Sequence, residues 1–206
     1  MAIPPRVETT PLAPGLTISR ALTGLWQVAD LERDGRTLDP VQAARDLEPY
    51  VDAGLTTFDM ADHYGSAELI AGELRRRRGD AVQLLTKWVP EPGPVTRDDA
   101  RAAIDRARSR LGVERVDLLQ FHTWAYDDPS WMDALFHLQE LKEAGAIGAI
   151  GLTNFDAAHL RVACASGVEV VSNQVAYSLL DRRAAGDLTE VARRYGVALL
   201  GYGTVA

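Results

Sequence analysis

Residues 96–122 read TRDDARAAIDRARSRLGVERVDLLQFH, and they contain one full unit of the pattern that decides the fold. Thr96 is followed three residues later by Asp99, a near-match to a capping box, so we expect a helix to begin there. Gly112 follows the helical stretch, where a residue that tolerates positive φ is wanted. The apolar run VDLLQFH then predicts a buried strand. This stretch therefore predicts a helix followed at once by a strand.

The same alternation of amphipathic and apolar segments continues from Asp39 onward, which predicts helices covering a parallel sheet. Strand cores are expected near Thr57, Leu85, Leu119, Ile150, Val171 and Leu199, and the earlier segment ISRALTGLW (residues 18–26) supplies one more. The later strands are about 28 residues apart, close to the roughly 30 residues of one strand-plus-crossover unit. Asp39-Pro40 and Ser66 are expected to cap two of the six intervening helices.

Seven strands and six helices without a doubly wound fingerprint favour a (β/α)8 TIM-barrel type of fold. We expect residues 1–206 to form one domain of this type. A complete barrel needs eight strands and about 250 residues. The sequence therefore predicts an incomplete barrel that stops at the end of its seventh strand, with open edges that could pair with another copy.

Composition excludes several classes of protein. The chain is 47% hydrophobic and 25% charged, which is typical of a globular domain, and its formal net charge of −7 argues against nucleic acid as a partner. One cysteine, Cys164, and an N-terminus without signal-peptide features favour a cytoplasmic location. No apolar stretch is long enough for a membrane helix.

Polar and aromatic side chains follow the expected strands at their C-terminal ends, where barrels carry their chemistry. Trp26 follows the first strand, Asp59 and Tyr64 the second, Lys87 the third and His122 the fourth; Thr153 with Asn154, Gln174 and Tyr202 follow the last three. A carboxylate, an ammonium and an imidazole gathered at one strand edge would perturb one another strongly, which is catalytic in character. No histidine or cysteine spacing suits a metal, so we expect no metal site.

Five strings at these strand ends resemble the aldo-keto reductases: FDMADHYG (58–65), TKW (86–88), LLQFH (118–122), GLTNF (151–155) and SNQ (172–174). The resemblance runs from about Leu22 to the last residue. It implies an oxidoreductase that reduces aldehydes or ketones, or oxidises alcohols or sugar lactols, by hydride transfer with a nicotinamide cofactor. The cofactor implied is NADPH, with NADH as the alternative, and the substrate a small carbonyl compound or sugar.

The resemblance also implies roles for four catalytic residues. Tyr64 would donate a proton to the carbonyl oxygen. Because an ordinary tyrosine has a pKa of about 10, the site needs a nearby cation, which Lys87 would supply. Asp59 would pair with Lys87, and His122 would orient the substrate oxygen.

Cofactor and substrate contacts follow from the same resemblance. Tyr202 would stack on the nicotinamide ring, while Thr153, Asn154 and Gln174 would bind its carboxamide. Trp26, Trp88 and Trp124 would wall the substrate pocket.

Two departures keep other functions open. Leu25 stands where the family often has a hydroxyl residue, and the loops that hold the cofactor phosphates in the family would lie beyond Ala206. Weak dinucleotide affinity is expected, and a non-catalytic or regulatory binding protein on a truncated reductase scaffold is the alternative. A barrel isomerase or metal hydrolase is a third, less favoured reading. The arginines of residues 75–78 are expected to be solvated charge at a helix end.

Overall fold

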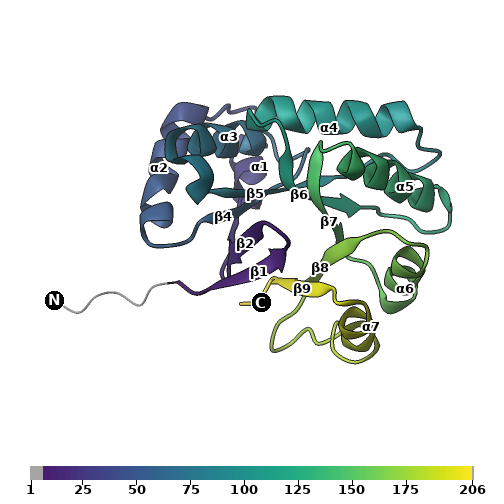
Figure 1. The fold of residues 1–206 in the computed structure, drawn as a ribbon. Coiled ribbons are helices and arrows are strands. Elements are labelled where there is room, and N and C mark those ends of the chain that lie inside the picture. The colour runs from purple at the N-terminus through teal and green to yellow at the C-terminus, as the bar shows by residue number, and fades with distance from the viewer. Residues whose placement is uncertain (1–6, 206) are drawn as a thin grey trace. The chain divides into compact units, whose positions relative to one another are not determined.

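The computed structural model describes residues 7–205, in which strands and helices alternate from residue 57 onward (Figure 1). The strands are β1 (Thr9–Ala13), β2 (Leu16–Ser19), β3 (Thr23–Gly24), β4 (Thr57–Asp59), β5 (Gln83–Trp88), β6 (Val116–His122), β7 (Ile147–Thr153), β8 (Val170–Ala176) and β9 (Ala198–Tyr202). The helices are α1 (Trp26–Glu32), α2 (Pro40–Asp52), α3 (Ala67–Arg78), the short 3-10 turn η1 (Gly79–Ala81), α4 (Arg97–Leu111), α5 (Ser130–Glu143), α6 (Ala157–Ala165) and α7 (Asp187–Tyr195). Strands β3 to β9 follow one another in the sheet in chain order, as helix crossovers between neighbouring strands require.

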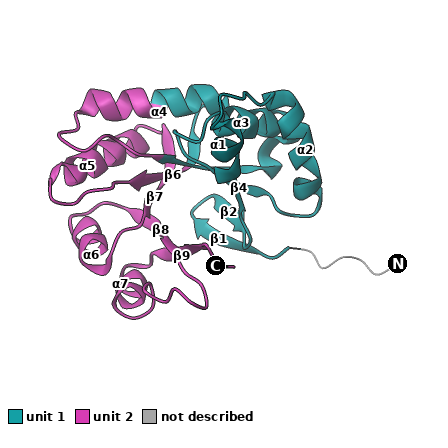
Figure 2. Cartoon of the chain, turned by 180° about the vertical axis from the view of Figure 1, so that it is seen from behind, with its two compact units in different colours: residues 1–87, 105–117 teal, residues 88–104, 118–206 magenta. Residues whose placement is uncertain are grey.

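The chain divides into two compact units, which Figure 2 shows in different colours. The first contains residues 1–87 and 105–117, and the second contains residues 88–104 and 118–206. The sequence boundary between them falls within α4 and β6 and just before Trp88.

In the first unit, parallel strands bring two polar positions to the same edge. Strand β4 pairs in parallel with β3 on one side and β5 on the other, with Asp59 opposite Gly24 and Leu85. Lys87 lies two residues beyond Leu85 on β5. Phe58 and Leu84, next to these positions, are fully buried. The carboxyl end of β4 therefore lies beside the last residues of β5.

The prediction for the first strand was only partly right. Of ISRALTGLW, Thr23–Gly24 alone forms β3, whereas Ile18 and Ser19 belong to β2, which pairs with β1 in an antiparallel hairpin. Trp26, expected just after that strand, is the first residue of α1. The count of six helices was therefore one too low for residues 7–205. Helix α1 has no capping side chain and only seven residues, so it carries no start signal.

Two of the three expected helix caps are confirmed. Asp39 accepts a hydrogen bond from the Val41 N–H, and Pro40 is the first residue of α2. Thr96 and Asp99 form a reciprocal capping box, because each side chain accepts the other residue's N–H, at 3.2 and 2.9 Å. The cap at Ser66 was wrong, since its hydroxyl makes no bond to α3.

The arginines of residues 75–78 were expected to be solvated, and three of them, although partly exposed, also form ion pairs. The side chains of Arg75, Arg77 and Arg78 are 23%, 26% and 28% exposed. Their acidic partners are Asp80 and Asp117 for Arg75, Glu48 for Arg77, and Asp52 with Glu48 for Arg78. The run therefore ties α3 to neighbouring elements of the first unit.

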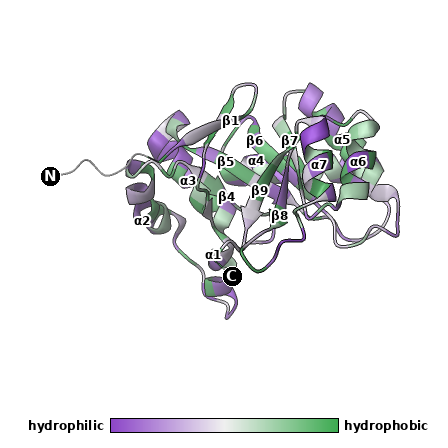
Figure 3. Cartoon of the chain, turned by 90° about the horizontal axis from the view of Figure 1, so that it is seen from below, coloured by the Kyte–Doolittle hydropathy of each residue, from purple (hydrophilic) through white to green (hydrophobic). Residues whose placement is uncertain are grey.

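In the second unit, β7, β8 and β9 pair in parallel. Thr153 lies opposite Gln174, and Ala176 opposite Tyr202, so three strand ends carry polar or aromatic residues at one edge. Phe121 and Phe155 are fully buried, with their ring centroids 6.2 Å apart. In Figure 3, β6 and β7 have the hydrophobic colour, while the helices mix hydrophobic and hydrophilic residues. Within residues 7–205, the helices lack the combination of length and apolar character that a membrane span requires.

Gly72 allows the close approach of α3 to the end of α4. A Cβ at this position would lie 2.7 Å from the carbonyl oxygens of Arg110 and Leu111. These backbone oxygens cannot rotate away as the end of a side chain can. Gly72→Ala should therefore lower the free energy of unfolding by about 1–2 kcal/mol, although alanine is the better helix former. Urea unfolding measures this change. Gly201→Ala is the matched control, since its Cβ would meet its nearest neighbours at 3.5 and 3.8 Å; equal stability of the two variants would contradict the packing argument.

Candidate active site

A buried ion pair joins the ends of β4 and β5. The ammonium of Lys87 donates to Asp59 Oδ2 at 2.6 Å and to the carbonyl oxygen of Met60 at 3.0 Å. The Lys87 side chain is 3% exposed and the Asp59 side chain 13% exposed. A buried charge needs such partners, because desolvation otherwise favours its neutral form. The pair therefore holds a fixed cation at this strand edge.

Tyr64 presents its ring to this cation. The Lys87 ammonium lies 5.5 Å from the centroid of the Tyr64 ring. The Trp26 and His63 rings both meet the Tyr64 ring edge-on, each with its centroid 4.8 Å away. The Tyr64 ring is therefore packed among aromatic groups beside a buried ammonium.

The loop that carries Tyr64 is anchored to β5 through its backbone. The Asp62 N–H donates to the Lys87 carbonyl oxygen at 3.0 Å, and Arg110 donates to the Asp62 carbonyl oxygen at 2.9 Å. Arg110 also pairs with the buried Glu68, which accepts from the Thr86 hydroxyl at 2.7 Å. Because Thr86 precedes Lys87, one polar network fixes both the loop and the strand that carries the lysine.

The second unit brings together the four residues expected to contact a cofactor. The Asn154 N–H donates to the Gln174 carbonyl oxygen at 2.8 Å, and the Tyr202 hydroxyl donates to Asn154 Oδ1 at 2.9 Å. The hydroxyl oxygen of Thr153 is buried and has no hydrogen-bond partner within residues 7–205. The four residues therefore form one polar cluster at the ends of β7, β8 and β9.

Asn154 has a left-handed backbone, with φ of 60°, which is uncommon for a residue with a side chain. The buried Asn173 amide holds the following residue in place: it donates to the Phe155 carbonyl oxygen at 2.8 Å and accepts from the Phe155 N–H at 3.3 Å. The chain therefore turns sharply after β7, as functional sites often require.

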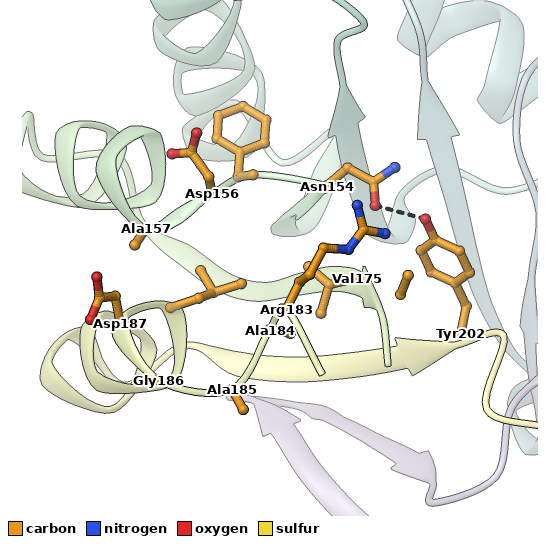
Figure 4. Close-up of a pocket in the computed structure, with 13 residues that line it drawn as sticks. Asn154, Asp156, Ala157, Val175, Arg183, Ala184, Ala185, Gly186, Asp187 and Tyr202 are labelled. Carbon is orange, nitrogen blue, oxygen red and sulfur yellow. Dashed lines mark hydrogen bonds between the residues drawn. The ribbon is translucent and has the colours of Figure 1, made fainter. Parts of the chain in front are cut away.

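An open cleft of about 710 Å³ borders this cluster. Asn154 and Tyr202 lie at one end, where Arg183 points toward them, and Asp187 lies at the start of α7 (Figure 4). Desolvation alone would raise the pKa of Asp156, another lining residue, but hydrogen bonds from His159 outweigh it, so this pKa lies below its usual value. The cleft therefore contains a guanidinium, two carboxylates and an amide.

The remaining predicted residues occupy different environments. His122 is buried at the end of β6, and the centroid of its ring lies 4.3 Å from the centroid of the Trp124 ring. Trp26 and Trp124 are exposed, whereas Trp88 is buried with its ring edge-on to Phe121. Trp88 thus occupies a core position.

Two residues of the site were missed from the sequence. Asn173 lies in the quoted string SNQ, but a strand asparagine gives no sign that it will bond a turn 18 residues away. Glu32 accepts three hydrogen bonds from residues after it in the chain, and nothing in its local sequence predicts them.

Comparisons of the sequence with a family model and with individual relatives agree with each other. The sequence model described as the aldo/keto reductase family matches residues 22–206. An uncharacterized oxidoreductase of Mycobacterium tuberculosis is 32% identical over 196 residues, which cover 92% of this chain and 59% of the relative. The NADH-specific methylglyoxal reductase of Escherichia coli is 26% identical over 216 residues, covering 91% of this chain and 64% of the relative. The chain thus spans about three fifths of the length of these relatives.

Solved structures agree with the fold. An aldo/keto reductase from Brucella melitensis matches 97% of this chain and 73% of its own, with a TM-score of 0.78 and 25% identity. A Bombyx mori aldo-keto reductase in complex with NADP matches 96% of this chain and 66% of its own, with a TM-score of 0.76 and 18% identity. The predicted barrel-type fold is confirmed, as an arrangement incomplete relative to these neighbours.

Proposed function

The chain belongs to the aldo/keto reductase family, and we propose that its function is hydride transfer between a nicotinamide cofactor and the carbonyl carbon of an aldehyde or ketone. The reverse reaction oxidises an alcohol or sugar lactol. The observation that carries this proposal is the buried Lys87–Asp59 pair, whose ammonium lies 5.5 Å from the centroid of the Tyr64 ring. This arrangement suits a phenol that must give up its proton near neutral pH.

Tyr64 acts as the proton donor in this mechanism. As the carbonyl carbon accepts hydride, negative charge develops on the carbonyl oxygen, and the Tyr64 hydroxyl donates its proton to that oxygen. Lys87 stabilises the resulting phenolate by charge, and the hydrogen bond to Asp59 holds the ammonium in place. The pairing also explains how a lysine is accommodated at a position with 3% exposure.

His122 orients the substrate in the proposal. Its imidazole is buried at a strand end, so its rotation is restricted. A fixed N–H donor at the carbonyl oxygen would raise the electrophilicity of the carbonyl carbon. Trp26 and Trp124, both exposed, supply flat apolar surface for the rest of the substrate.

The polar cluster of the second unit fits a nicotinamide. Thr153, Asn154 and Gln174 offer hydroxyl and amide groups that suit a carboxamide, and the buried Thr153 hydroxyl lacks a partner within residues 7–205. Tyr202 supplies an aromatic face, and its hydroxyl bond to Asn154 fixes the ring. When bound, a reduced nicotinamide supplies the hydride. NADPH is the proposed form, with NADH as the alternative that the name of the Escherichia coli relative suggests.

An absorbance assay of reduced cofactor tests the proposal. We expect the chain to oxidise NADPH or NADH in the presence of small aldehydes such as methylglyoxal or glyceraldehyde. Asn154→Ala should raise the KM for the cofactor about tenfold, because it removes one hydrogen-bonding amide from the proposed carboxamide site. Gln42→Ala is the control, since it removes a side-chain amide from α2 whose hydrogen bond to Asp46 is exposed, and it should leave this KM unchanged.

Two outcomes would count against the proposal. No oxidation of either cofactor at high concentration would favour the alternative of a non-catalytic binding protein on a reductase scaffold. Oxidation with an unchanged cofactor KM in Asn154→Ala would place the nicotinamide elsewhere.

A further inference from the structure

Both ends of helix α1 contact the loop that carries Tyr64. Its first residue, Trp26, packs edge-on against the Tyr64 ring with an interplanar angle of 82°. Its last residue, Glu32, bonds to Ser66, two residues after Tyr64. Helix α1 therefore contacts the Tyr64 ring through its first residue and Ser66 through its last residue.

The Glu32 carboxylate accepts three hydrogen bonds. Oε2 accepts from the Ser66 N–H at 2.8 Å, and Oε1 accepts from the Ser66 hydroxyl at 2.6 Å and from the Leu38 N–H at 2.9 Å. Glu32 thus holds Ser66, the residue that precedes α3 and whose own hydroxyl makes no cap bond to that helix. Hydrogen bonds to an ionised group are stronger than those between neutral groups, so Glu32 links α1 strongly to Ser66.

The charge state of Glu32 supports this connection. Desolvation alone would raise the pKa of Glu32, but the bonds from the Ser66 hydroxyl and from the Leu38 and Ser66 N–H groups outweigh it, and the pKa is lowered. The carboxylate is therefore ionised at neutral pH. A lowered pKa in the folded protein contributes stability that is present above the ordinary value of about 4.5 and is lost as the pH falls through the folded value.

Gly65 makes room for the carboxylate. A Cβ on Gly65 would overlap Glu32 Oε2, and the residue has φ of +53°, a conformation that favours glycine. Gly65 joins Tyr64 to Ser66. Glycine at position 65 therefore suits both the positive φ of the turn and the space that the Glu32 carboxylate occupies.

We propose that Glu32 is a positioning residue for Tyr64, with α1 acting as a strap that holds the phenol ring against Trp26. The Tyr64 turn has its own bonds, from the Tyr64 N–H to the Ala61 carbonyl oxygen and from the Ala67 N–H to the Tyr64 carbonyl oxygen, at 3.1 and 3.0 Å. These fix the backbone path of the turn. Glu32 adds the connection to α1, and α1 also carries Trp26, whose ring packs edge-on against the Tyr64 ring. This inference rests on the proposed role of Tyr64 as proton donor.

Fluorine NMR of the chain labelled with ring-fluorinated tyrosine tests the inference without cofactor or turnover. The chain has six tyrosines, and the Tyr64 resonance is the one that disappears in Tyr64→Phe. We expect Glu32→Ala to shift or broaden the Tyr64 resonance and to leave those of Tyr126 and Tyr195, which belong to the second unit, unchanged. Glu32→Gln should restore part of the parent position, because its amide oxygen can still accept from Ser66.

Asp30→Ala is the matched control, since it removes a carboxylate of the same helix whose ion pair is with the exposed Arg33. It should leave the Tyr64 resonance in place. An unchanged Tyr64 resonance in Glu32→Ala would overturn the inference, and so would an equal shift of all six resonances, which indicates a general structural role. Absence of turnover in the parent chain would count against the proposed function and not against this result.

A double substitution supplies a second test. Gly65→Ala should lower the midpoint of thermal unfolding in the parent chain, because the new methyl group meets Glu32 Oε2. In the Glu32→Ala background the same substitution should lower it less, since only the backbone strain remains. Equal losses in the two backgrounds would show that Gly65 does not accommodate Glu32 and would contradict the strap.

Discussion

Tyr64→Phe lowers kcat for aldehyde reduction by about 10²- to 10⁴-fold, the usual contribution of a positioned general acid. The substitution removes the hydroxyl and keeps the ring, so the edge-on contacts with Trp26 and His63 and the nearby Lys87 ammonium are retained. The KM for the cofactor should stay close to that of the parent chain. Steady-state kinetics with the aldehyde that gives the fastest turnover measure both constants.

Tyr50→Phe is the control for this prediction. Tyr50 lies on α2 with an exposed side chain, so the same hydroxyl is removed there at a surface position. Its kinetics should match those of the parent chain. If Tyr64→Phe also kept the parent kcat, the proton would come from another group and the proposed role of Tyr64 would be wrong.

The sequence predicted the later strands and the polar residues at their ends because both depend on local patterns. Apolar runs of five to seven residues between amphipathic segments identify strands, and parallel strands place their ends at one edge. Asp59 and Lys87 therefore come together, as expected, although they are 28 positions apart.

The features that the sequence did not predict depend on contacts between distant residues. β3 has only two residues, so its identity is decided by its pairing with β4 and not by its own composition. Ser66 is a residue type that often caps helices, but here its hydroxyl donates to Glu32 and accepts no N–H of α3. The structural preference of a single residue type predicts its role poorly where a charged side chain from another element bonds to that residue.

Asp59→Ala lowers the free energy of unfolding by about 3–5 kcal/mol, because it leaves the buried Lys87 ammonium without its carboxylate. The Met60 carbonyl oxygen still accepts from Lys87 but carries no full charge to balance it. Chemical denaturation of the parent and the variant measures the loss. Glu8→Ala breaks an exposed pair with Arg20, whose side chains are 66% and 72% exposed for Arg20 and Glu8, and should cost at most about 1 kcal/mol.

The double variant Asp59→Ala/Lys87→Met separates the stabilising role of the pair from its chemical role. Removing both charges leaves an apolar side chain in a site where Lys87 is 3% exposed, so most of the lost stability should return. Turnover should not return, since the cation beside Tyr64 is gone. A double variant as unstable as Asp59→Ala alone would mean that packing around Asp59, and not the unpaired charge, causes the loss. Recovered turnover would remove Lys87 from the mechanism, because methionine cannot stabilise a phenolate by charge.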